Sequence, residues 1–181
     1  MKIAPLFKAS KKIDKDFLNF ELRLIHTGQH YDDSMSEAFF SDLNIPKPDF
    51  NFNVGSGSHA EQTAKIMIEY EKLLSRDAPY LCIVVGDVNS TIACAIAAKK
   101  NKILVAHIEA GLRSHDLTMP EEINRIVTDS ISDYFFTTTK EAGDILIQSG
   151  IEKEKIFFVG NTMIDSLQSN LSNLKKPSLY D

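Results

Sequence analysis

The chain has 181 residues, of which 43% are hydrophobic and 25% charged, and its formal net charge at pH 7 is −5. This composition is typical of a globular protein, and an acidic chain without a basic patch is not expected to bind nucleic acid. It contains no run of about 18 apolar residues, so no membrane span is expected. Cys82 and Cys94 lie in apolar segments without metal-ligand spacing. We therefore expect two buried free thiols, a reducing cytoplasmic compartment and no metal site.

Predicted strands and helices alternate along the chain. Segment 20–26 predicts a strand and 33–43 a helix, which the prolines of the next segment end. Apolar residues at helical spacing predict an amphipathic helix over 59–75. The later elements are, in chain order, a strand over 80–85, a helix over 90–100, a strand over 102–108, a helix over 120–132, a strand over 134–138, a helix over 140–150, a strand over 155–160 and a helix over 162–174. Such alternation with apolar strands predicts an α/β fold, a doubly wound parallel sheet with helices on both faces.

Polar motifs follow the predicted strands. The motif GDVNST follows the strand over 80–85, EAGLRSHD follows 102–108, and NTMID follows 155–160. In folds of this class, ligands bind beyond the carboxyl ends of the strands. The dense charge of segment 107–125 is therefore expected to form the rim of a ligand site rather than part of the core.

Five segments keep an order and spacing that resemble the non-hydrolysing UDP-N-acetylglucosamine 2-epimerase family: TGQHYD, GSGSHAEQTAKI, GDVNSTIA, HIEAGLRS with MPEEINRIVTD, and VGNTMID. The family has two Rossmann-like domains in the glycosyltransferase-B arrangement. The resemblance implies that residues 1–170 form the first of them, that 171–181 begin a linker, and that the second domain is absent. It also implies interconversion of UDP-N-acetylglucosamine and UDP-N-acetylmannosamine through 2-acetamidoglucal and UDP, with no nicotinamide, flavin or metal cofactor.

The resemblance assigns the catalytic acid/base positions to Asp87, Glu109 and Glu121. Carboxylates crowded into a closed cleft become better bases, and two of them on opposite faces of the sugar could remove and return the C2 proton. Structural alternatives remain open for all three residues. Asp87 could cap the helix at Ser90, Glu109 could pair with the arginine four residues later, and Glu121 could form a capping box with Thr118.

Other positions carry binding roles in the resemblance. Lys2 matches a substrate-binding lysine of the family. Arg113 and His115, which lie on the charged loop itself, are our further candidates for substrate binding. Gln29 and His30 match a pair that binds a second UDP-N-acetylglucosamine as activator in some bacterial members, although the loop before His59 has glycine and serine where those members have glutamine. Gly55–Ser58 could also be simply a flexible lead into the following helix.

Three charged residues near this rim have open roles. Arg113 and Arg125 either orient the carboxylates or form simple ion pairs, and His107 is expected to be a core histidine.

The sequence begins inside the first motif of the family, so the first strand and a phosphate-binding arginine are expected to be missing. Because that strand is the central one of the sheet, the strands near 20–26 and 80–85 should lack their shared neighbour.

Two further hypotheses compete with an epimerase half that is inactive on its own. One is a glycosyltransferase-B domain that transfers sugar, which usually needs a single base. The other is a non-catalytic remnant or interaction module of the same fold. By resemblance, the chain is expected to form a homodimer or to associate with a separate second domain.

Overall fold

The computed structural model describes residues 2–13, 20–28, 40 and 43–171. The chain divides into two compact units, one formed by Met1–Leu24, Asp32–Lys47 and Asn161–Asp181 and the other by Ile25–Tyr31 and Pro48–Gly160. Most of the helix predicted over 33–43 and the linker predicted from 171 lie outside the described residues. No helix in the described part of the chain is long and apolar enough to cross a bilayer.

The smaller unit contains two packed helices, α1 (Ala4–Ser10) and α7 (Thr162–Asn170). Helix α7 begins where the sequence predicts it, because the Asn161 side chain caps it by accepting a hydrogen bond from the Met163 backbone. Lys8 Nζ donates to Ser169 Oγ at 3.1 Å and links the two helices. Helix α1 is not predicted from the sequence, because seven residues are too short to show a helical period.

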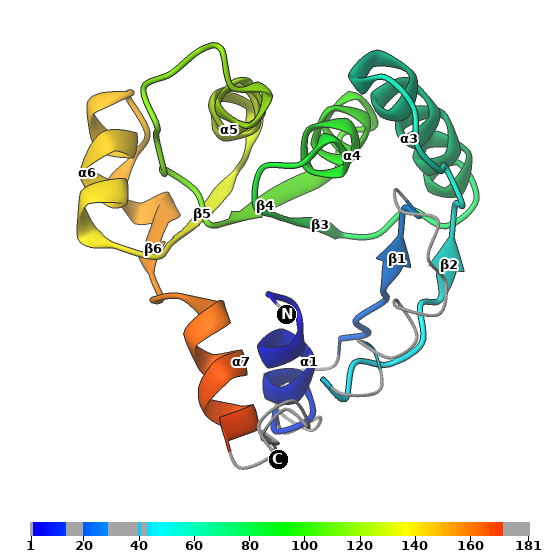
Figure 1. The fold of residues 1–181 in the computed structure, drawn as a ribbon, viewed down its shortest axis with the longest axis horizontal. Coiled ribbons are helices and arrows are strands. Elements are labelled where there is room, and N and C mark those ends of the chain that lie inside the picture. Colours follow the sequence, from blue (N-terminus) through cyan, green and yellow to red (C-terminus); the bar gives the residue numbers. More distant parts are fainter. Residues whose placement is uncertain (1, 14–19, 29–39, 41–42, 172–181) are drawn as a thin grey trace, which may run out of the picture. The chain divides into compact units, whose positions relative to one another are not determined.

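The larger unit is built on a four-stranded parallel sheet whose strands follow one another in chain order (Figure 1). Helices connect consecutive strands, as is usual between parallel strands, and α3, α4 and α5 pack side by side. The elements are β3 (Leu81–Val85), α4 (Asn89–Lys100), β4 (Leu104–Ile108), α5 (Pro120–Ile131), β5 (Tyr134–Thr137), α6 (Lys140–Gln148), the short 3-10 helix η1 (Lys153–Lys155) and β6 (Ile156–Phe158). The predicted alternation is confirmed over this whole stretch.

A second, two-stranded parallel sheet precedes α3 (His59–Leu74) and pairs β1 (Ile25–His26) with β2 (Phe50–Asn51). Among the described residues, no strand joins β1 to β3, so the gap predicted between these strands is present. Strand β1 is much shorter than the predicted strand over 20–26. Strand β2 is missed in the sequence because the nearby prolines indicate a break rather than a strand.

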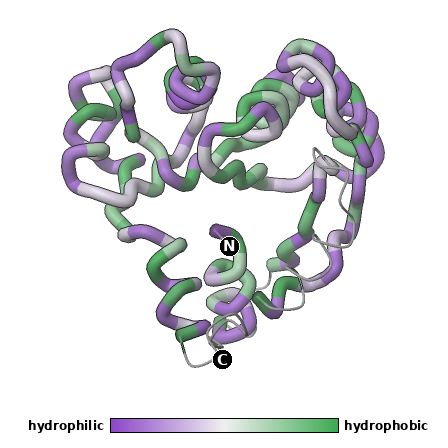
Figure 2. The backbone as a smooth tube through the Cα atoms, in the orientation of Figure 1, coloured by the Kyte–Doolittle hydropathy of each residue, from purple (hydrophilic) through white to green (hydrophobic). Residues whose placement is uncertain are grey.

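Helix α3 packs against both sheets. Its buried residues Ile66 and Tyr70 belong to one apolar cluster that contains Cys82 of β3, and Ile25 of β1 packs against the same cluster. The Tyr70 ring lies 6.5 Å from that of Phe52, centroid to centroid. Figure 2 shows the apolar residues along β3, β4 and α4 that complete this core. The two sheets therefore share a single core through α3.

Both cysteines are buried free thiols, as predicted. Burial raises the pKa of the Cys82 thiol to about 11, because a low-dielectric environment disfavours the thiolate. Neither thiol is therefore placed to act as a nucleophile.

Gly111, in the loop after β4, is expected to tolerate no side chain. Its φ is +79°, and a Cβ atom there would lie 2.2 Å from the Ala142 carbonyl oxygen and 2.8 Å from its carbon. Gly111→Ala should therefore cost more than the roughly 1–2 kcal/mol of the left-handed backbone alone. The matched control is Gly150→Ala, because Gly150 has φ +90° but no atom within 4 Å of the added Cβ. Equal falls in melting temperature for the two variants would show that the contact with Ala142 does not matter.

Candidate active site

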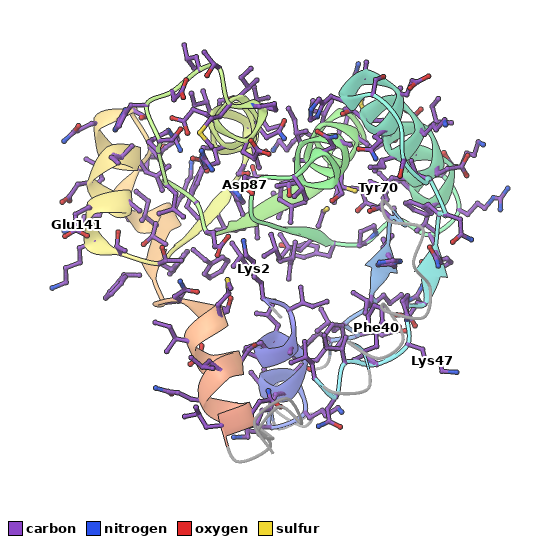
Figure 3. The ribbon with its side chains drawn as sticks, viewed as in Figure 1. Lys2, Phe40, Lys47, Tyr70, Asp87 and Glu141 are labelled. Atoms are coloured by element: carbon purple, nitrogen blue, oxygen red, sulfur yellow. The ribbon has the colours of Figure 1, made fainter. Side chains whose placement is uncertain are left out.

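The carboxyl ends of β3 and β4 place two polar loops side by side. The strands pair in parallel from Leu81 with Leu104 to Val85 with Ile108, and the Gly86 N–H continues the pairing by donating to the Ile108 carbonyl at 2.9 Å. Asp87 follows directly in the first loop, and Glu109 opens the second. Figure 3 labels Asp87 in the loop between β3 and α4. The rim predicted from the sequence is therefore formed by adjacent segments.

The Asp87 carboxylate is held by an arginine from α5. Arg125 Nη1 donates to Asp87 Oδ2 at 2.5 Å, and the Asp87 side chain keeps 29% of its surface exposed. Asn124 Nδ2 donates to the Asp87 backbone carbonyl at 2.8 Å. Helix α4 has Val88 as its N-cap residue and no side-chain cap. The capping role considered for Asp87 is therefore wrong, and Arg125 forms an ion pair with it.

Glu109 lies in a turn with an uncommon backbone conformation. Its φ is +71° and only 7% of its surface is exposed. The left-handed region costs a residue with a side chain about 1–2 kcal/mol, and such strain concentrates at functional sites. Arg113, the partner considered for Glu109, donates to the Leu112 carbonyl at 2.8 Å and to Asp129 Oδ2 at 2.6 Å. The carboxylate that Arg113 is seen to orient is thus that of Asp129.

Glu121 lies in the first turn of α5, whose N-cap is Met119 with no side-chain cap. The backbone N–H and the hydroxyl of Thr118 donate instead to Asp116 Oδ1, at 2.9 and 2.6 Å. The predicted capping box between Thr118 and Glu121 is therefore wrong, because a local turn with Asp116 uses the threonine and the helix starts one residue later. The partly exposed Glu121 carboxylate is left at the positive end of the helix dipole.

Glu122 is a central residue of the rim that the sequence analysis does not single out. It is 1% exposed and accepts hydrogen bonds from the backbone N–H groups of Ser114 and His115, both at 3.0 Å, and from Arg125 Nε at 2.9 Å. Burial alone would raise the pKa of Glu122, but the hydrogen bonds from Ser114, Arg125 and His115 outweigh it and lower the pKa to about 2. Its ionised carboxylate therefore clamps the loop after β4.

Helix α5 buries a polar face and exposes an apolar one. Its buried residues are Glu122, Asn124, Thr128 and Asp129, whereas Ile123 and Ile126 are 48% and 38% exposed. Glu122, Arg125 and Asp129 have the i, i+3, i+7 spacing that places residues on one side of a helix. The sequence shows from this spacing that the three side chains share one side of α5, but it does not show that this side is buried.

A sequence model of UDP-N-acetylglucosamine 2-epimerase matches residues 11–179. The chain belongs to this family. It is 48% identical over 176 residues to the UDP-N-acetylglucosamine 2-epimerase of Methanocaldococcus jannaschii, a match that covers 97% of this chain and 47% of the relative. It is also 48% identical over 145 residues to the UDP-2,3-diacetamido-2,3-dideoxy-D-glucuronate 2-epimerase of Pseudomonas aeruginosa, covering 79% of this chain and 41% of that protein.

The fold of the chain matches solved structures of the family. The M. jannaschii epimerase in complex with UDP-GlcNAc and UDP superposes with a TM-score of 0.89 at 47% identity, covering 98% of this chain and 48% of that one. The match confirms the predicted α/β class, the Rossmann-like half of a glycosyltransferase-B fold. The chain thus spans about half the length of the family members it matches.

The larger unit holds most of the residues that the family resemblance singles out. Asp87, Glu109, Glu121 and Arg113 lie there, together with His115, which is exposed and adopts a φ of +59°. Lys2 belongs to the smaller unit, in the turn before α1. Gln29 and His30 lie outside the described residues. The segment before His59 leads into α3 as expected, with a capping box between Ser58 and Glu61 that fixes its last residue.

Removing the Glu122 charge is expected to weaken the fold and to alter its response to acid. The folded-state pKa of about 2 lies below the ordinary 4.5, so this group stabilises the protein fully above about pH 4.5 and loses its contribution as the pH falls toward 2. The contribution is on the order of 3 kcal/mol. Glu122→Gln should therefore unfold at lower urea concentration at pH 7, with a shallower loss of stability toward pH 3.

The exposed Glu152, which pairs with Lys155 on the surface, provides the control. Glu152→Gln should leave both the urea midpoint and its pH dependence close to those of the unmodified chain. If Glu122→Gln keeps the original pH dependence, the clamp is not ionic.

Proposed function

We propose that this chain supplies the carboxylate side of the active site of a UDP-N-acetylglucosamine 2-epimerase. One observation carries the proposal: within a family of epimerases, Asp87, Glu109 and Glu121 lie on neighbouring segments at one rim, and buried partners hold that rim in place. A structural role as a helix cap is removed for Asp87 and for Glu121. Proton transfer at carbon is the chemistry that such a set of carboxylates suits.

The proposed reaction has two balanced halves. One carboxylate takes the C2 proton while the C1–O bond breaks and UDP leaves with the bonding electrons, which gives 2-acetamidoglucal. UDP then adds back to C1, and a second carboxylate donates a proton to the opposite face of C2. We assign these exchanges to Asp87, Glu109 and Glu121, and substrate binding to Lys2, Arg113 and His115. An activator role for Gln29 and His30 is a further proposal.

A second substrate is favoured by the Pseudomonas aeruginosa relative. Its name describes a 2-epimerase of UDP-2,3-diacetamido-2,3-dideoxy-D-glucuronate, and its identity to this chain equals that of the M. jannaschii epimerase, at 48%. Epimerisation at C2 would use the same carboxylates with either sugar. The two candidates differ in the groups on C3 and C5, so a direct comparison of turnover decides between them.

The test uses a fusion protein, in which this chain is joined to the half of the M. jannaschii epimerase that it does not match. UDP-N-acetylmannosamine should form from UDP-N-acetylglucosamine, as followed by proton NMR, and in D₂O the product should carry deuterium at C2. The unmodified M. jannaschii protein is the positive control. A folded fusion protein that epimerises neither nucleotide sugar would refute the proposal.

We place self-association on the outer surface of the larger unit. A groove of about 400 Å³ lies between α3, α4 and α5 and is lined in part by Met67, Ile92 and Ile123. The apolar face of α5 beside it is exposed, as expected for a surface that meets a partner. A second copy of the chain, related by a two-fold axis, is the proposed occupant. Ile123→Glu should shift the protein toward monomer in sedimentation velocity.

Two further proposals concern the location of the chain and a second-domain partner. The buried free thiols and a nucleotide-sugar substrate support a cytoplasmic location. Association of the chain with a separate second domain is the alternative to self-association, and mixing the chain with the unmatched M. jannaschii half would detect it.

A further inference from the structure

His107 is fully buried in β4, and both of its ring nitrogens face hydrogen-bond acceptors. Nδ1 lies 2.7 Å from Asp129 Oδ1, and Nε2 lies 2.8 Å from the Gly86 carbonyl oxygen. A carbonyl and an ionised carboxylate only accept hydrogen bonds, so both contacts are satisfied at once when each ring nitrogen carries a proton. A neutral imidazole, with one N–H, would leave a lone pair facing one of the two oxygens. The geometry therefore fits the doubly protonated, cationic ring.

The Asp129 carboxylate supplies the balancing negative charge, and it also contacts residues of the loop after β4. Oδ2 accepts from the Gly111 backbone N–H at 3.1 Å and from Arg113 Nη1 at 2.6 Å, while Oδ1 faces His107. The residue is 3% exposed. An ionised carboxylate between an imidazolium and a guanidinium has every neighbour donating to it, which is the arrangement that makes a buried charge tolerable.

This network joins the two loops that carry Asp87 and Glu109. At one end, the Gly86 carbonyl immediately precedes Asp87. At the other, Gly111 and Arg113 follow the left-handed turn at Glu109, a conformation that persists only where its surroundings hold it. His107 therefore contacts the loop of Asp87 directly, through the Gly86 carbonyl. It reaches the loop after Glu109 through the Asp129 carboxylate.

We infer that His107 is a positioning residue, held as an imidazolium between Gly86 and Asp129, and that it fixes the loops of Asp87 and Glu109 relative to each other. The role in turnover rests on the proposed function above, whereas the charged state of the ring does not. His107 touches no reacting atom in this account and exchanges no proton with the sugar.

The charged state is tested on this chain itself. In ¹⁵N-labelled protein, both ring nitrogens of His107 should show imidazolium shifts and attached protons, because each of them faces a hydrogen-bond acceptor. The signals are assigned by their loss in His107→Gln, and the exposed His115 serves as the reference ring. A single protonated nitrogen on His107 would overturn the inference.

The positioning role is tested in the fusion protein. Glutamine carries its N–H donors on a single nitrogen, which cannot occupy the positions of both ring nitrogens, so His107→Gln should lower kcat on the order of 10²-fold with little change in KM. The matched control is Asp133→Asn, which breaks a comparable contact with Lys99 Nζ at 2.8 Å near the other end of β4. The control should lower the melting temperature and keep kcat.

The outcomes of these experiments distinguish a positioning role of His107 from a purely structural one. Normal kcat in folded His107→Gln, with only a lower melting temperature, would make the residue structural and overturn the positioning role. Asp129→Asn, which keeps the size of the side chain, gives a second test if His107→Gln does not fold, and normal kcat there would count equally against it. An inactive parent fusion protein would refute the proposed function, while the NMR result would still decide the state of the ring.

Discussion

Glu109→Gln in the fusion protein is expected to lower epimerase turnover by about 10²–10⁴-fold, the usual cost of removing a general base. Glutamine has nearly the size of glutamate, so the left-handed turn at residue 109 and its burial should be preserved. The amide cannot accept the C2 proton. Turnover is measured by NMR, and binding of UDP by calorimetry should change little.

Two results would contradict this assignment. Turnover near that of the unmodified fusion protein would give Glu109 a structural role. A parallel loss of UDP binding and melting temperature would show that the substitution disturbs the turn rather than the chemistry. Glu69→Gln, at an exposed residue on α3 paired with Lys72, provides the control for replacing a glutamate by its amide.

Glu121→Gln is expected to abolish deuterium incorporation at C2 while leaving the melting temperature unchanged. The melting temperature should not change, because Glu121 does not take part in a capping box. A fall in rate of similar size, about 10²-fold or more, follows if the carboxylate exchanges a proton with the sugar. Incorporation is measured in D₂O with the fusion protein, alongside thermal unfolding.

The neighbouring residue provides a matched comparison. Glu122 differs from Glu121 in being buried and held by three hydrogen bonds, so Glu122→Gln should mainly lower stability, whereas Glu121→Gln should mainly lower rate. Unchanged deuterium incorporation in Glu121→Gln would remove that residue from the reaction, whatever its melting temperature.

The sequence predicts the larger unit well because its elements are long or strongly apolar. Strands β3 to β6 and the helices between them occur where the apolar runs and helical periods place them. Short elements without a period, α1 and β2, are missed. The capping box at Thr118 fails for a different reason: the pattern is correct, but Asp116 competes for the same threonine.

The candidate site is predicted only in part. The positions of Asp87 and Glu109 at the ends of their strands follow from parallel pairing, which a sequence can indicate. The buried carboxylates Glu122 and Asp129 cannot be identified in the same way, because their partners are backbone groups and side chains brought close only by folding. Charged residues on a predicted helix are ordinarily assigned to its exposed face.

The inverted helix α5 has a consequence for redesign of this protein. A rule that matches hydrophobicity to burial would select polar replacements for Ile123 and Ile126 and apolar ones for Glu122 and Asp129. The first pair of changes would still remove apolar contacts, since Ile123 and Ile126 are only 48% and 38% exposed. Apolar residues in place of Glu122 and Asp129 would give the helix an ordinary apolar buried face. The hydrogen bonds that these carboxylates accept from the loop after β4 would then be lost. In this helix, the carboxylates that hold the two loops in place lie on the side that faces inward.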